Sequence, residues 1–266
     1  MNGYTIDRKW MKRDAKEAMR THKPSTYLIS FVFIVIGLVL NWLGRKLQFP
    51  SLTTQEVMEL INDPGALQGF AISMAKETSA IARILSFAID IMEIILAGGF
   101  ALACLNVARR LEANVGTLFE MFGWFFRFLW LNILMGIFIF LWSLLLVIPG
   151  IIAAYRYSMA AFIFFDDPEK GALQCIRESK EMTRGYKGQL FVLDLSFIGW
   201  AILSIIPFVA IYTEPYIATT KANFYRALRG EFNVQQQQQQ YYGGQWTPYQ
   251  KKRLRREAPD SRDFAP

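Results

Sequence analysis

Two carboxylic acids, Asp90 and Glu93, lie near the middle of a long apolar stretch at residues 81–107. Because they are three residues apart, they share one face if the stretch is helical. The nearest basic residue on that helix, Arg83, would lie about 10 Å from Asp90 along the helix axis. An ionisable group inside a membrane is costly, so this pair is a candidate site for proton relay or cation coordination. The alternative is a polar pair that is hydrogen-bonded within a helical bundle or lines a small wet cavity.

Four further charged residues fall inside apolar stretches, and their depths predict two ion pairs. Arg127 and Asp194 each lie a few residues from one predicted membrane face. Arg156 and Glu214 lie at a similar distance from the turns at the opposite face. Since depth follows from the helical rise per residue, we expect Arg127 to pair with Asp194 and Arg156 with Glu214. Such pairs would hold neighbouring helices together.

The sequence offers little for enzymatic chemistry. It has no glycine-rich phosphate loop, no array of metal ligands and no nucleophile with a histidine base. His22 is the only histidine, and Cys104 and Cys175 are the only cysteines. Two isolated thiols do not make a disulfide framework or a metal site. We therefore expect no enzyme activity, no cofactor and no bound metal.

The apolar stretches predict an all-α, polytopic transmembrane bundle. The chain of 266 residues is 53% hydrophobic and 15% aromatic, which is too apolar for an ordinary soluble domain. A helix crosses a bilayer with about 20 residues. The sequence predicts about six spans, the last of them weakly apolar: 27–43, 81–107, 122–148, 151–165, 190–206 and 208–228. A four-span arrangement stays open, with the hairpin dipping in and out of the membrane or the segment 207–228 lying on its surface.

The dipeptide Pro149-Gly150 is predicted to be the hinge of a tight helical hairpin between the third and fourth spans. Proline lacks a backbone donor, and glycine tolerates almost any backbone angle, so the pair can supply a bend.

The distribution of basic residues predicts the orientation and the domain limits. Seven Lys and Arg residues lie in 1–24 and eight after residue 225, but only three lie in 44–79. Because positive charge is retained on the cytoplasmic side, both termini are expected in the cytoplasm. We predict a basic amphipathic arm at 1–24, a membrane domain at 25–229 and a disordered tail at 230–266, which contains six consecutive glutamines and a basic run.

Two segments are predicted to be amphipathic helices lying on the membrane surface. In the arm, Met11, Ala15, Ala18 and Met19 collect on one face, and residues 168–182 show a similar division. Together with the net charge of +7, this pattern favours contact with anionic lipid or with a membrane protein partner. No nucleic-acid module is present, and nucleic-acid binding is not expected.

Several short motifs resemble a bacterial integral-membrane family, domain of unknown function 975. They are Ile148–Ile151, Arg156–Met159, Ser179 with Met182, Gly185 and Lys187, Leu195–Trp200, Pro215-Tyr216 and Phe224-Tyr225. The hairpin and the charged segment after it are also distantly similar to the membrane domains of some glycerophosphodiester phosphodiesterases, without their catalytic domain. The resemblance implies a multi-span protein of the bacterial plasma membrane and brings no established activity.

Two functions follow from these features. The first is a non-enzymatic protein that organises lipid or partner proteins at the cytoplasmic face through its arm, its charged helix and its basic tail. The alternative is a small transporter or ion-coupled permease that uses Asp90 and Glu93.

Overall fold

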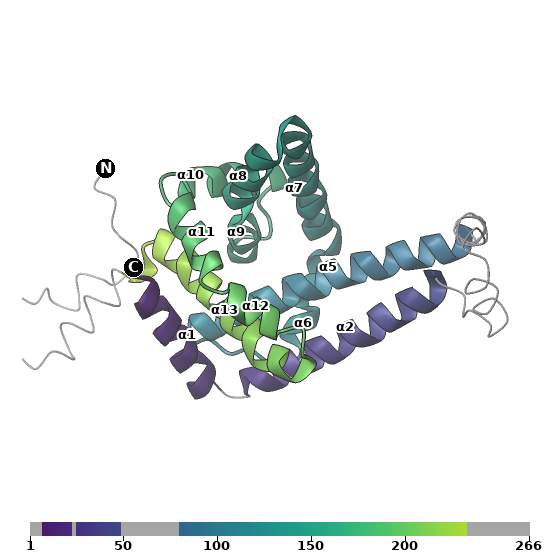
Figure 1. Ribbon diagram of the computed structural model, residues 1–266, viewed down its shortest axis with the longest axis horizontal. Coiled ribbons are helices and arrows are strands. Elements are labelled where there is room, and N and C mark those ends of the chain that lie inside the picture. The colour runs from purple at the N-terminus through teal and green to yellow at the C-terminus, as the bar shows by residue number, and fades with distance from the viewer. Residues whose placement is uncertain (1–6, 23–24, 49–79, 233–266) are drawn as a thin grey trace, which may run out of the picture. The chain divides into compact units, whose positions relative to one another are not determined.

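The computed structural model describes residues 7–22, 25–48 and 80–232, and every regular element in these ranges is a helix (Figure 1). The prediction of an all-α fold is therefore confirmed. The Gln-rich tail and most of the loop at 44–79 lie outside the described residues. The chain divides into two compact units, residues 1–225 and 226–266, and the contacts discussed below lie within the first.

From α5 onward, the described helices follow one another with short connections. Their bounds are α1 Arg8–Thr21, α2 Thr26–Gln48, α5 Ala80–Ala108, α6 Thr117–Glu120, the 3₁₀ helix η1 Met121–Trp124, α7 Phe125–Leu145, α8 Val147–Tyr157, α9 Ala160–Asp166, α10 Ala172–Met182, α11 Lys187–Leu195, α12 Ile198–Leu203 and α13 Pro207–Leu228.

Four helical stretches in the described part of the chain are long and apolar enough to cross a membrane: Thr26–Lys46, Ile81–Ala108, Thr117–Leu145 and Val147–Asp166. They coincide with the first four predicted spans. Helix α2 packs along α5, and α7 packs along α8 (Figure 1). Their exposed surfaces are rich in large apolar side chains, among them Phe126 and Leu144. These properties are those of a membrane-embedded protein.

The bend between α7 and α8 lies at Leu146, three residues before the predicted hinge. Leu146 has an extended backbone, with φ −166° and ψ 149°. Pro149 lies in the first turn of α8, where a helix makes no intrahelical bond through its N–H, so proline is tolerated there. Gly150 is needed for close packing, because a Cβ on it would collide with Ser143 of α7. The two residues thus shape the start of α8 and its approach to α7.

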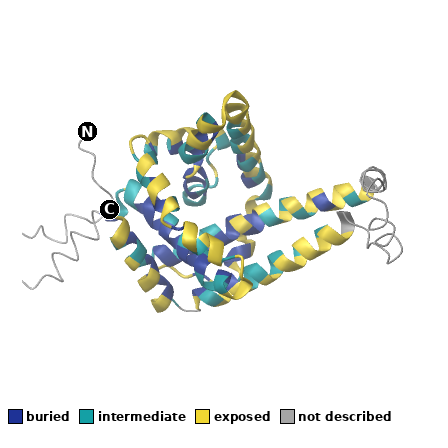
Figure 2. Cartoon of the chain, viewed as in Figure 1, coloured by how far each residue is buried: buried dark blue, intermediate teal, exposed yellow. Residues whose placement is uncertain are grey.

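Helix α13, expected to be a weak span or a surface segment, is largely buried between residues 210 and 225 (Figure 2). Its buried residues include small polar ones, Thr213, Thr219, Thr220 and Asn223, each fully inaccessible. Such residues let helices approach closely and form hydrogen bonds inside a bundle. The low hydropathy of α13 is therefore explained by its protein surroundings, which accept polar side chains that lipid would not.

The two amphipathic helices bury their apolar faces in the protein. In α1, Met11, Ala15, Ala18 and Met19 are at most 1% exposed, and the helix packs against α2 and α5. In α10, Cys175, Ile176 and Ser179 are buried against α7, α8 and α9. The division of α1 into two faces was predicted from the sequence. In α10 the prediction was partly wrong, because Leu173, expected on the apolar face, is 57% exposed. In both helices the neighbour of the buried face is protein.

Candidate functional site

A polar cluster joins the ends of helices that are far apart in the sequence. Arg109, just after α5, donates to both carboxylate oxygens of Asp166 at the end of α9, over 2.5 and 3.2 Å. The Tyr225 hydroxyl of α13 donates to the same carboxylate over 2.5 Å. The Arg109 and Asp166 side chains are 22% and 12% exposed. A bidentate, mostly buried pair of this kind holds three elements in a fixed arrangement.

A second part of the cluster attaches α1 to the same region. Arg110 donates to Asp14 of α1 over 2.9 Å. The Asn223 amide donates to the other carboxylate oxygen of Asp14 over 3.0 Å and to the Met11 carbonyl over 3.2 Å. Several segments predicted to lie on one membrane face therefore lie close together. They are the arm, the segment after α5, the segment after α9 and the end of α13.

The outward face of α1 carries a row of positive charge. Lys9, Arg13, Lys16 and Arg20 are all exposed, and their spacing of four, three and four residues puts them on one side of the helix. We call these four residues the basic stripe. The buried face of α1 lies opposite, so the exposed side chains of the stripe are available to an anionic surface.

Lysines at the edge of the stripe attach α1 to the aromatic residues of α11–α13. The Lys12 ammonium donates to the Ser196 hydroxyl over 2.7 Å and lies 4.3 Å from the centre of the Phe197 ring. Lys16 lies 5.2 Å from the centre of the Tyr216 ring. Burial, followed by the charges of Arg8 and Lys16, lowers the pKa of Lys12 from its usual value. Lys12 and Lys16 thus help to position α1, whereas the other three residues of the stripe, Lys9, Arg13 and Arg20, are left for contacts outside the protein.

The predicted ion pair between Arg127 and Asp194 is replaced by other contacts. Asp194 pairs with Lys221 of α13 over 3.2 Å. Arg127 donates to the Pro168 carbonyl over 3.3 Å and lies over the Trp124 ring. Lys221 lies seven residues before the end of α13, and Asp194 lies seven residues after the start of α11. Depth alone therefore left two candidate partners for Asp194, and helix packing selected Lys221.

The structure does not bring Arg156 and Glu214 together as an ion pair. The Arg156 Nε is buried and makes no hydrogen bond within the described part of the chain. The Arg156 carbonyl accepts from the Ser179 hydroxyl over 2.8 Å, while Glu214 is half-buried on α13.

The carboxylic acids of α5 face different surroundings. Asp90 is exposed, whereas Glu93 is partly buried in a groove of about 500 Å³ between α2 and α5. The groove also contains Asn41, whose side-chain oxygen accepts two hydrogen bonds from Arg45. Its other lining is apolar or small. Glu93 therefore offers one carboxylate to a narrow apolar groove. No group of His, Cys, Asp or Glu side chains suited to a metal ion occurs in the described ranges.

The motifs that carry the family resemblance meet in the folded chain. Ser179 of α10 accepts from the Met159 amide over 3.2 Å and so ties α10 to the α8–α9 junction. In a second region, the Phe197 and Trp200 rings pack edge-on against Tyr216, with centroid distances of 5.4 and 6.0 Å. These residues serve packing, and Gly185 adopts a φ of +88° that favours glycine.

Residues 143–231 match the family described as Protein of unknown function (DUF975). The match covers about a third of the chain and confirms the resemblance over that segment, which runs from the end of α7 to just beyond α13. No curated protein matches the chain. No solved structure matches it either.

Sequence reasoning missed the packing of α1 and the link between Arg109 and Asp166. A signal for the first exists, because the apolar face of α1 consists of Met and Ala. Helices that insert into a membrane surface usually present Trp, Phe or Leu. A signal for the second is that both residues end long apolar stretches on the same predicted face.

Proposed function

We propose that this protein is a non-enzymatic, multi-span protein of the bacterial plasma membrane that gathers anionic lipid at its cytoplasmic face. The observation that carries the proposal is the basic stripe of α1. Because the apolar face of α1 is buried in protein, the helix is fixed with its cationic side chains outward. Each Lys or Arg close to an anionic membrane surface contributes about 1 kcal/mol of attraction.

The position of α1 in the chain supports contact with lipid headgroups. Helix α1 ends at Thr21, and the first apolar stretch begins at Thr26. The stripe therefore lies beside the point where the chain would enter the membrane. In this proposal both termini face the cytoplasm. This holds whether residues 187–228 cross the membrane twice or re-enter it, because both ends of that segment then lie on the same face.

Native mass spectrometry from mild-detergent micelles of mixed lipids tests the proposal. The stripe variant removes three exposed charges, Lys9→Gln, Arg13→Gln and Arg20→Gln. A matched variant removes the same three residue types from exposed positions in or just after α10, Arg177→Gln, Lys180→Gln and Arg184→Gln. We expect the wild type and the α10 variant to retain anionic lipid and the stripe variant to lose it. Equal retention by all three proteins would refute the assignment to α1.

A second candidate function, ion-coupled transport, is favoured by the position of Glu93 in the groove between α2 and α5. A single carboxylate among apolar side chains can bind a proton or a cationic group. Flux measured in proteoliposomes should then fall with Glu93→Gln. The exposed Asp90→Asn serves as a neighbouring control, and flux unchanged by Glu93→Gln would remove this residue from any transport mechanism.

A further inference from the structure

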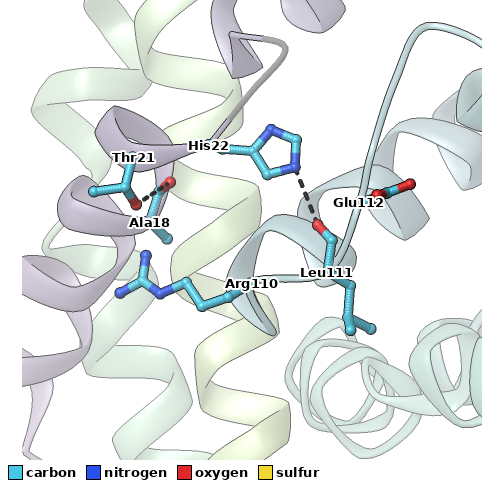
Figure 3. Close-up of a pocket in the computed structure, with 6 residues that line it drawn as sticks. All are labelled: Ala18, Thr21, His22, Arg110, Leu111 and Glu112. Atoms are coloured by element: carbon cyan, nitrogen blue, oxygen red, sulfur yellow. Dashed lines mark hydrogen bonds between the residues drawn. The ribbon is translucent and has the colours of Figure 1, made fainter.

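A small polar pocket lies where the end of α1 meets the turn after α5 (Figure 3). Its volume is about 170 Å³, and its lining residues are Ala18, Thr21, His22, Arg110, Leu111 and Glu112. This volume suits a small polar headgroup and is too small for an acyl chain. The pocket does not include the exposed side chains of the basic stripe.

The pocket lies at the depth of lipid headgroups if the four apolar stretches cross the membrane. His22 precedes the stretch that begins at Thr26 by four residues, and Arg110 follows the stretch that ends at Ala108 by two. Separations this short keep both residues near the ends of the spans, because four residues extend over at most about 14 Å. Polar headgroups occupy this zone on either side of the hydrocarbon core.

The turn that forms the pocket is held in an unusual conformation. Arg110 has a φ of 61°, which is rare for a residue with a side chain. Its guanidinium is bound by Asp14, and the Leu111 amide donates to the Asn106 carbonyl over 2.9 Å. One ring nitrogen of His22 lies 3.1 Å from the Leu111 carbonyl. Such a conformation persists only where its surroundings determine it, so the shape of the pocket is fixed before any ligand binds.

The pocket walls carry opposite charges. Figure 3 shows Arg110 and Glu112 on different sides, with His22 between α1 and the turn. The guanidinium of Arg110 can bind an anion while it remains bonded to Asp14 through one of its nitrogens, because it has five N–H donors. Glu112 is exposed, and its carboxylate can accept from a primary ammonium group. The arrangement is complementary to a phosphate and an ammonium separated by a short linker.

We propose that this pocket binds the phosphoethanolamine headgroup of a membrane lipid, with the phosphate toward Arg110 and the ammonium toward Glu112. A choline headgroup has no N–H to donate to Glu112, and a glycerol headgroup has no positive charge. Both should bind more weakly. The inference rests on the membrane embedding proposed above but not on the basic stripe, which selects net negative charge.

The test uses the full-length protein in mild-detergent micelles that contain phosphatidylethanolamine, phosphatidylcholine or phosphatidylglycerol, with the retained lipid measured by native mass spectrometry. We expect the ethanolamine lipid to be retained about tenfold better than the choline lipid. The variant Glu112→Gln should abolish this preference, whereas Glu120→Gln, an exposed glutamate outside the pocket, should leave it intact. Equal retention of the two lipids by the wild type would overturn the proposal.

Two further arms separate the remaining outcomes. Soluble glycerophosphoethanolamine should compete weakly, and competition at concentrations equal to those of the lipid would reassign the pocket to a water-soluble phosphoamine. The stripe variant should keep the preference for ethanolamine. A stripe variant that retains anionic lipid like the wild type would refute the proposed function alone, while loss of the ethanolamine preference only in Glu112→Gln would support the pocket.

Discussion

The carboxylate of Asp166 offers a direct test of how the helix ends are held together. It accepts two bonds from Arg109 and one from Tyr225. Removing one partner of a buried ion pair costs about 3–5 kcal/mol, and a hydrogen bond to a charged group contributes about 1.5–3 kcal/mol. Because this pair is partly exposed and asparagine keeps one acceptor oxygen, we expect Asp166→Asn to lower the free energy of unfolding by about 2–3 kcal/mol.

The variant Tyr225→Phe should cost less, about 1–2 kcal/mol, because it removes one hydrogen bond and leaves the ion pair in place. Tyr225 and one Arg109 nitrogen bind the same oxygen of Asp166. The double variant should therefore lose less than the sum of the two single losses, by at least about 0.5 kcal/mol.

Unfolding in mixed micelles titrated with a denaturing detergent, followed by tryptophan fluorescence, measures these differences. Glu169→Gln is the control, because this exposed residue lies three positions from Asp166 and should change stability by less than about 0.5 kcal/mol. If Asp166→Asn were no more destabilising than Glu169→Gln, the cluster would not hold the helix ends together.

Two other predictions concern packing and thiol chemistry. Gly99→Ala should destabilise the protein by about 1–3 kcal/mol in the same unfolding assay, because its Cβ would collide with the Leu118 backbone. Gly136→Ala is the control and should not destabilise it, because the space around Gly136 is open. Equal losses of stability in the two variants would contradict the close packing at Gly99. Burial, followed by the Glu178 charge, raises the pKa of the Cys175 thiol. Less thiolate is then present at a given pH, so Cys175 should be alkylated slowly until the protein is unfolded. The measurement uses a variant that lacks Cys104. Rapid labelling of the folded protein would contradict the prediction, because it would show that the Cys175 thiol is accessible.

The sequence predicts the helical class, the first four apolar stretches and the two faces of α1 because these depend on local periodicity and length. It does not show what covers each face. Met11 and Ala15 would suit a lipid surface or a protein surface, and only the folded chain shows that α1 packs against the protein, on α2 and α5. The weak hydropathy of α13 has the same origin, since a helix surrounded by protein needs no lipid-compatible side chains.

Pairings and bends depend on three-dimensional packing and were harder to predict. Counting residues placed Asp194 at the right depth for Arg127, but Lys221 lies at a similar depth and is the partner observed. A Pro-Gly sequence predicts a bend, yet proline at the start of a helix is also favourable. Here the bend is at Leu146, and Gly150 is required by the approach of Ser143.

The measurement that tests the central claim most directly is the affinity of the purified protein for a fluorescent anionic lipid relative to its zwitterionic analogue. At about 1 kcal/mol for each basic residue, the stripe variant should lose up to about 100-fold of the preference for the anionic lipid. Raising the ionic strength should weaken the preference of the wild type, because salt screens exposed charges. A wild-type preference that is unchanged in the stripe variant and insensitive to salt would contradict the account.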